Sequence, residues 1–167
     1  MAGRKIDVRF VPALTAGRNE LYSNRNCGQP VYAATFIRKR QIVLDASLRD
    51  QPDELARILI HELFHFAWVR LGEAARRSYE ALLIEEWHRH ARGELGWSAE
   101  SRKKILTRDV PVPSRQWRDY VCESFCDTAA WLYSGLRRHP EFTLPNSYRA
   151  RRAEWFQKVF GSREIPI

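Results

Sequence analysis

The segment from Leu55 to Leu71 restricts the fold of this chain more than any other feature. Apolar side chains fall on nearly every face of the helix that it would form: Ile58, Leu59, Ile60, Leu63, Phe64, Phe66, Ala67, Trp68 and Val69. A helix that is apolar all round belongs in a protein core. Its polar interior residues, His61, Glu62 and His65, are costly to bury and therefore require a chemical explanation.

The length of 167 residues suits one compact domain, over residues 1–167, that needs no disulfide to fold. The N-terminal residues lack an apolar stretch of signal-peptide type, and no apolar run reaches membrane-spanning length. The three cysteines are an odd number, which argues against a disulfide framework. We therefore expect a monomeric protein in the cytoplasm, with no membrane partner.

The net charge of +8 is the feature that favours a nucleic-acid partner. Clustered basic side chains bind phosphate backbones by releasing counterions. Here, however, 23 of the 28 basic residues are arginines, and they are scattered along the whole chain. Nucleic acid is thus a possible partner but not the favoured one.

The N-terminal part of the chain carries strand patterns. Ile6 to Val11 alternates apolar and charged residues, as a half-buried strand does, and 17–30 is predicted to be a polar loop. Val31 to Ile37 and Gln41 to Asp45 are rich in β-branched or other apolar residues and are joined by a short charged turn. They predict a hairpin, and hence a small antiparallel or mixed N-terminal sheet.

The remainder of the chain is predicted to be mostly helical. Asp50 or Gln51 can cap the apolar helix, with Pro52 in its first turn, and Ser98 can cap a later short helix. The further predicted helices are Glu73–Arg92, Ser98–Leu106, Trp117–Leu136 and Ser147–Phe160. The predicted class is α+β, with the small sheet packed on the apolar helix and a mostly helical C-terminal half.

The explanation for the polar residues of the apolar helix is the sequence His61-Glu62-Leu63-Phe64-His65. Residues four apart on a helix share a face, so that both imidazoles can bind one metal ion while Glu62 projects beside it. Zinc with three protein ligands keeps a position for water, and lowers the pKa of that water to about 7. Glu62 is then placed to act as the general base.

A third ligand is expected in a later helix that contains Tyr120 to Asp127. Glu123 and Asp127 lie four apart there and share a face. One carboxylate can bind the metal while the other accepts the second ring N–H of a ligating histidine. We assign Glu123 as the ligand and Asp127 as its supporting residue.

These residues resemble the gluzincin group of zincin metallopeptidases. In that group HExxH on one helix is completed by a glutamate on a later helix, often with an acidic residue four positions beyond it. His61, Glu62, His65, Glu123 and Asp127 match this pattern. The resemblance covers two helices and implies a zincin-like domain with one zinc ion that hydrolyses peptide or protein substrates. We expect an endopeptidase, although the sequence does not separate endopeptidase from exopeptidase action.

The resemblance implies two further features. A strand near the metal, either Val31 to Ile37 or Gln41 to Asp45, would bind an extended peptide by strand addition. A tyrosine or histidine would stabilise the oxyanion of the tetrahedral intermediate, and the candidates in this chain are Tyr120, Tyr148 and His139.

Two other functions remain open at this stage. The SprT-like proteases, which act on DNA-linked proteins, complete HExxH with a histidine, for which His88 and His90 are the candidates. A zinc-binding domain without catalytic activity is the other alternative, although such a site would have no need of Glu62. The segment from Cys27 to Pro30 is also similar to the inhibitory cysteine loop of matrixin propeptides, but a plain turn explains it better.

Overall fold

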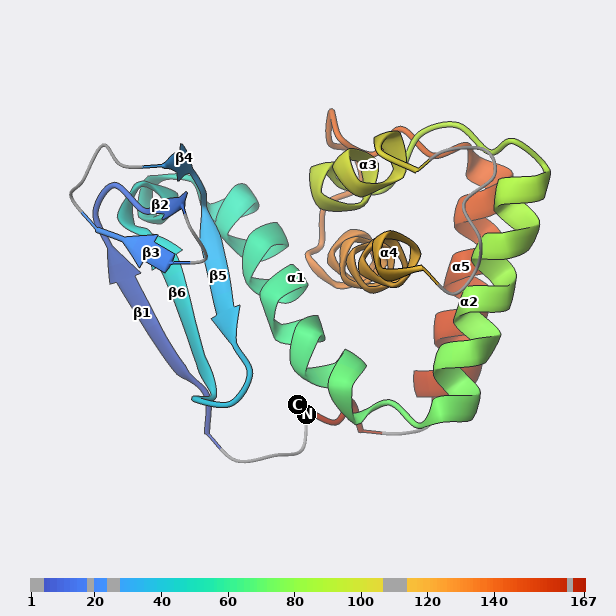
Figure 1. Cartoon of the computed structure of the whole chain (residues 1–167), viewed down its shortest axis with the longest axis horizontal. Coiled ribbons are helices and arrows are strands. Elements are labelled where there is room, and N and C mark those ends of the chain that lie inside the picture. Colours follow the sequence, from blue (N-terminus) through green and yellow to red (C-terminus); the bar gives the residue numbers. More distant parts are fainter. Residues whose placement is uncertain (1–4, 18–19, 24–27, 107–113, 162–163) are drawn as a thin grey trace.

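The computed structural model describes residues 5–17, 20–23, 28–106, 114–161 and 164–167. The strands occupy one side of the molecule and four of the helices the other, with the long helix α1 (Pro52–Arg70) between them (Figure 1). The α+β class predicted from the sequence is therefore confirmed, as is the helical C-terminal half.

The main sheet has three strands in the order β1-β6-β5, which are Asp7–Val11, Gln41–Asp45 and Ala33–Phe36. β1 pairs with β6 in parallel, and β5 pairs with β6 in the antiparallel direction, so the sheet is mixed. The predicted hairpin is β5–β6. Because β6 lies in the centre, β5 forms one edge of the sheet.

A second small sheet lies largely in the segment 17–30, which the sequence predicts to be a loop. It has the order β3-β2-β4, with bounds Glu20–Tyr22, Thr15–Gly17 and Gln29–Pro30. All of these pairings are antiparallel. The loop prediction for 17–30 is wrong in part, because strands of two or three residues are too short to show an alternating pattern.

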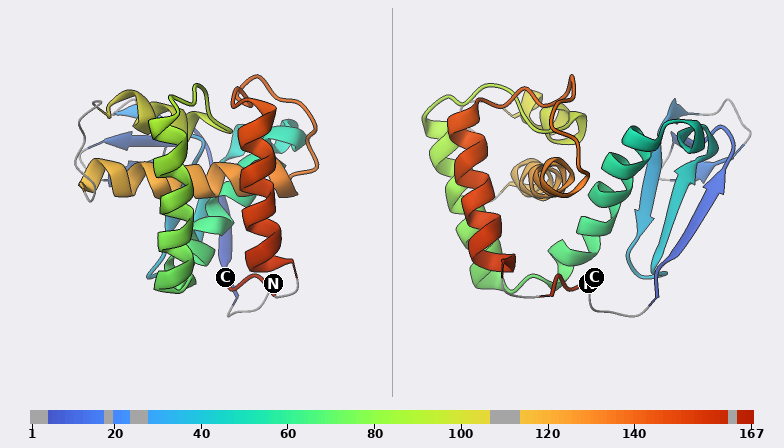
Figure 2. Two further views of the ribbon diagram at one scale, coloured as in Figure 1. Left: turned by 90° about the vertical axis from the view of Figure 1, so that its right-hand side faces the viewer. Right: turned by 180° about the vertical axis from the view of Figure 1, so that it is seen from behind.

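The helices follow a short 3-10 helix, η1 (Ala46–Asp50), and Gln51 precedes α1 without a side-chain capping bond. The remaining helices, which Figure 2 shows from two sides, are α2 (Glu73–His88), α3 (Trp97–Lys104), α4 (Arg115–Tyr133) and α5 (Asn146–Phe160). α2 and α5 lie side by side, and α4 crosses them (Figure 2). Within the described ranges, none of the helices is long and apolar enough to span a bilayer.

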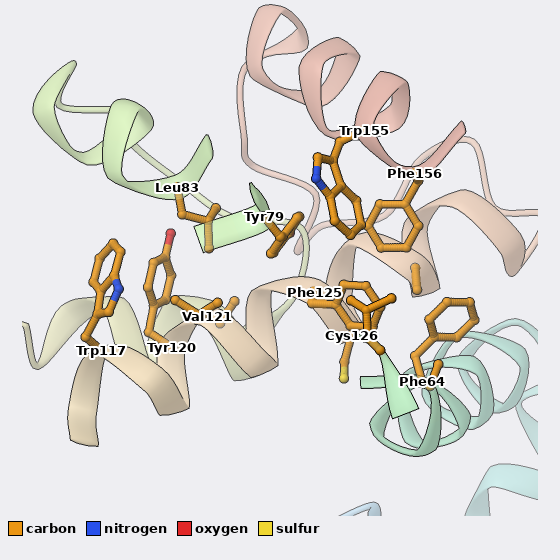
Figure 3. Packing of buried hydrophobic residues seen from close by; sticks show 14 of the residues in the cluster. Phe64, Tyr79, Leu83, Trp117, Tyr120, Val121, Phe125, Cys126, Trp155 and Phe156 are labelled. Carbon is orange, nitrogen blue, oxygen red and sulfur yellow. The ribbon is translucent and has the colours of Figure 1, made fainter. Parts of the chain in front are cut away.

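α1 is buried from two directions, which confirms the prediction that it belongs in the core. On one side Ile58 and Phe66 pack with Ile42 and Leu44 of the sheet. On the other side an aromatic cluster joins it to the later helices (Figure 3), with members Phe64, Tyr79, Phe125, Trp155 and Phe156. A helix with two packed faces needs apolar residues all round, as the sequence shows.

Candidate metal centre

α1 places both histidines of the HExxH segment on the side that faces α4. The rings of His61 and His65 meet edge to face, with their centroids 5.0 Å apart. His61 and Glu62 are buried, with only 7% and 8% of their surfaces exposed to solvent. The predicted sharing of one helix face by the two imidazoles is therefore present in the structure.

α4 brings a carboxylate to the same point. Glu123 Oε2 lies 3.2 Å from His61 Nε2 and 4.0 Å from His65 Nε2. Two ligand atoms that are each about 2.1 Å from a tetrahedral zinc ion are about 3.4 Å apart. The two distances from Glu123 Oε2 are close to this separation, so a carboxylate and two imidazoles, a ligand set that zinc accepts, are present where the motif implies the ion.

The electrostatics of this centre favour a cation. Burial opposes a charge on His61, yet its pKa is raised well above the ordinary value because Asp127 and Glu123 face the ring. Burial also opposes ionisation of Glu123, but hydrogen bonding and charge attraction to His61 lower the pKa of Glu123 to about 2. The carboxylate of Glu123 is therefore held ionised beside two ring nitrogens, as a metal ligand must be.

Asp127 occupies the supporting position expected for it. Its side chain is almost fully buried, and His61 Nδ1–H donates to Asp127 Oδ1 over 2.7 Å. The other oxygen, Oδ2, accepts the backbone N–H of Ala99 in α3 over 2.8 Å. Because Nδ1 donates to Asp127, Nε2 is the ring atom of His61 that a metal ion beside Glu123 would bind in place of a proton.

His65 has sulfur neighbours in place of a carboxylate. Its Nδ1 lies 3.5 Å from Cys126 Sγ and 3.6 Å from Cys122 Sγ. Figure 3 shows the Cys126 sulfur on the side of α4 nearer to α1, beyond the aromatic cluster. These two cysteines are free thiols.

A second set of donor atoms competes with the one that includes Glu123. Atoms of His61, His65 and Cys126 lie within 4.8 Å of one another. Cys126, however, contacts His65 through Nδ1, has no exposed surface and is not among the described residues that line the cleft. Glu123 faces the Nε2 atoms of both histidines and lines a cleft. We therefore favour Glu123 as the third ligand.

The cleft has a volume of about 630 Å³ and lies between the β5 edge of the sheet and the helices α3 and α4. Its floor holds His61, Glu62, His65 and Glu123. The wall on the strand side includes Ala33 and Thr35, and the wall on the α3 side includes Trp97 and Arg102. A chain segment that enters this cleft would pass directly over the candidate metal centre.

Known proteins offer no guide to this arrangement. Comparison with protein-family models, with curated proteins and with solved structures found no match.

None of the three residues considered for the oxyanion is among the described residues that line the cleft. Tyr120 donates to Glu94 Oε1 over 2.6 Å, and its hydroxyl points toward α2 (Figure 3). Tyr148 packs in a separate cluster with Leu95. His139 contacts Glu54 of α1 through Nε2. Residues three apart on a helix lie near one face, so the position of Tyr120 before Glu123 did not exclude it, and it is the hydrogen bond to Glu94 that directs its hydroxyl elsewhere.

The rival histidines are also placed away from the centre. α2 ends at His88, and the exposed His90 has a φ of 54°, so the helix stops short of the predicted Arg92. Among the described residues that line the cleft, neither His88 nor His90 is present. The segment of Cys27 cannot be judged in the same way, because Cys27 lies outside the described residues.

Sequence reasoning missed several residues that shape the site. Thr35 donates to Glu62 Oε2 over 2.6 Å, and Gly96 lies against the Asp127 carboxylate. Trp97 begins α3, whose start the sequence places at Ser98; the predicted Ser98 cap is wrong because Gly96 precedes the helix. One available signal was the hydroxyl of Thr35 in a strand of otherwise apolar residues. The contact of Gly96 with Asp127 cannot be predicted from the local sequence.

Proposed function

We propose that this protein is a zinc-dependent metallopeptidase. The observation that carries the proposal is the approach of Glu123 Oε2 to the Nε2 atoms of His61 and His65, on the floor of a cleft that also contains Glu62. Three ligands leave one side of a tetrahedral ion accessible, as in catalytic rather than structural zinc sites.

A zinc ion in this centre would supply Lewis acidity to the scissile carbonyl and lower the pKa of a water molecule to about 7. Glu62 follows the first ligand on α1 and lines the same cleft, so its carboxylate is placed to take a proton and later to give it to the leaving amine. Asp127 keeps His61 in the tautomer that offers Nε2. His61 and Asp127 are both buried, so bulk water competes little for the hydrogen bond between them.

The strand wall of the cleft suits an extended peptide. Tyr32 O accepts the N–H of Asp45, which indicates that the residues at 32, 34 and 36 form the hydrogen-bonded pairs with β6. In an antiparallel ladder the intervening residues direct their main-chain groups to the other side. Ala33 and Thr35 therefore present N–H and C=O groups at the edge of the sheet, where a substrate strand could pair.

The test compares the wild type with Glu123→Ala and His88→Ala. Zinc per chain would be measured by elemental analysis, and cleavage of an unfolded protein substrate would be followed on the same samples. We expect Glu123→Ala to lose zinc and activity, because it removes a charged ligand, and His88→Ala to match the wild type. Glu62→Gln should keep zinc and lose cleavage, since it removes only the base.

The other outcomes separate the alternatives. Loss of zinc in His88→Ala instead would support the SprT-like function, and loss in Cys126→Ala but not in Glu123→Ala would move the third ligand to the thiol. Zinc binding without any cleavage would indicate a zinc-binding domain without catalytic activity. A wild type that binds no zinc would contradict the proposal.

A further inference from the structure

Thr35 is a polar residue in an otherwise apolar row. Side chains two apart in a strand point to the same face of the sheet, so Ala33, Thr35 and Ile37 form one row. Ala33 and Ile37 pack against the cluster that joins the sheet to α1. A hydroxyl in this row is costly unless it has a partner, and its partner lies on α1.

That partner is Glu62, the general base of the proposed reaction. Thr35 Oγ1 lies 2.6 Å from Glu62 Oε2 and 3.2 Å from the backbone O of the same residue. A threonine hydroxyl has one proton to donate, and the shorter contact to the carboxylate oxygen is the stronger one. The hydrogen bond therefore fixes one carboxylate oxygen of Glu62 and leaves the other for the reacting water.

Thr35 also belongs to the strand edge that lines the cleft. Its main-chain groups are directed away from β6, to the edge at which an extended peptide would pair. One residue thus contacts the general base through its side chain and offers its backbone to the substrate. Binding at the edge and orientation of the base are joined at this position.

We propose that Thr35 is a positioning residue, which holds Glu62 in the orientation for proton transfer when a peptide pairs with β5. This inference rests on the proposed metallopeptidase function. Thr35 acts through Glu62 and touches neither the metal ligands nor the scissile bond. The hydroxyl of Thr35, rather than the shape of its side chain, holds Glu62 in this orientation.

The experiment compares Thr35→Val, which keeps the shape and removes the hydroxyl, with Thr35→Ser, which keeps the hydroxyl. Thr15→Val is the matched control, since Thr15 is a buried threonine on β2 that does not line the cleft. Each variant would be measured for kcat and KM on an unfolded protein substrate, for zinc affinity against a competing chelator, and for the melting temperature.

We expect Thr35→Val to lower kcat by about ten- to a hundredfold, the range set by a hydrogen bond to a charged group. KM and zinc affinity should stay within about twofold of the wild type, because the ligands are untouched. Thr35→Ser should recover most of the loss in kcat, and Thr15→Val should show none.

Three results would overturn the inference. If the wild type is active and Thr35→Val keeps the wild-type kcat, the hydrogen bond from Thr35 does not orient Glu62 for the reaction. If Thr35→Val loses kcat and zinc affinity together and Thr35→Ser recovers neither, Thr35 contributes to the packing of the site and not to the position of Glu62. A zinc-loaded wild type that cleaves nothing overturns the proposed function, and with it the role of Thr35.

Discussion

At the scale of single residues, the charges buried outside the cleft show how the site is held in place. Arg152 and Glu94 have no exposed surface, and Arg152 Nη1 lies 2.8 Å from Glu94 Oε2. Glu94 also accepts from Lys103 over 2.8 Å and from Tyr120 over 2.6 Å. The network joins α5, α4 and α3 to the segment that precedes Gly96, and so supports the α3 wall of the cleft.

The pKa of Glu94 leads to a prediction about acid stability. Burial acts against ionisation, but Arg152 and Lys103 hold the pKa of Glu94 below its ordinary value of 4.5. A carboxyl whose pKa is lower in the folded state stabilises the fold above its unfolded pKa, and this contribution is lost as the pH falls through the folded pKa. The stabilisation from Glu94 is therefore complete at neutral pH and disappears below 4.5.

We expect Glu94→Gln to lower the free energy of unfolding by about 3 kcal/mol at neutral pH, because it leaves Arg152 buried with less compensating charge. The difference from the wild type should shrink at about pH 3. Urea unfolding of both proteins at neutral pH and at about pH 3 measures this difference. The matched control is Glu73→Gln, which removes an exposed charge that pairs with Arg77, and should change little. An equal deficit for Glu94→Gln at both pH values would contradict the assignment.

At the scale of elements, α3 is a short helix whose first amide groups are satisfied by other parts of the chain. The N–H of Trp97 donates to Glu141 Oε2 over 2.7 Å, and the N–H of Ala99 donates to Asp127 Oδ2 over 2.8 Å. Carboxylates are favourable partners at a helix N-terminus. Asp127 thus supports α3 with one oxygen and His61 with the other.

Gly96 is required by this double use of Asp127. A Cβ atom at Gly96 would overlap the Asp127 carboxylate. We expect Gly96→Ala to displace the carboxylate from His61 Nδ1 and to lower zinc affinity by about ten- to a hundredfold, the effect typical of losing an outer-shell partner. Competition with a chelator measures the affinity.

Gly72→Ala is the matched control for this substitution. Gly72 also precedes a helix, but a Cβ there meets nothing within 4 Å. Its zinc affinity should equal that of the wild type. Equal affinities for wild type, Gly96→Ala and Gly72→Ala would show that Asp127 does not support the metal centre.

At the scale of the whole molecule, the cleft separates the strand side from the helical side, and each side contributes an exposed aromatic residue. Tyr32 is 59% exposed just before β5, and Trp97 is 68% exposed at the start of α3. Both line the cleft that contains the candidate metal centre. Large apolar side chains exposed in a cleft are typical of binding surfaces.

If the proposed function holds, these two residues should favour substrates with large apolar side chains near the cleaved bond. We expect Trp97→Ala and Tyr32→Ala to lower kcat/KM for a peptide with phenylalanine at that point by about tenfold, through loss of aromatic contact. A peptide with glycine there should be affected less. Ile105→Ala is the control, because Ile105 is 56% exposed and is not among the described residues that line the cleft. Equal losses on both peptides would contradict this specificity.

The sequence by itself determined the class of fold and the first half of the site. The apolar residues on every face of α1 require burial on two sides, and the spacing of His61 and His65 follows from helix geometry alone. Both are local properties, so they could be predicted. The approach of Glu123 to these histidines was predicted as well, through the resemblance of Glu123 and Asp127 to a known pattern, and the distances agree with it.

Only the tertiary structure decided which residues surround this centre. Thr35 meets Glu62 across 27 positions of sequence, and Ala99 meets Asp127 across 28. Such contacts depend on how the sheet and α3 pack against α1 and α4, and helical or strand periodicity carries no information about packing between elements. For the same reason Tyr120 proved to face Glu94, and His88 to lie outside the cleft. Local spacing selects the face of one helix, whereas the neighbours of that face depend on long-range packing.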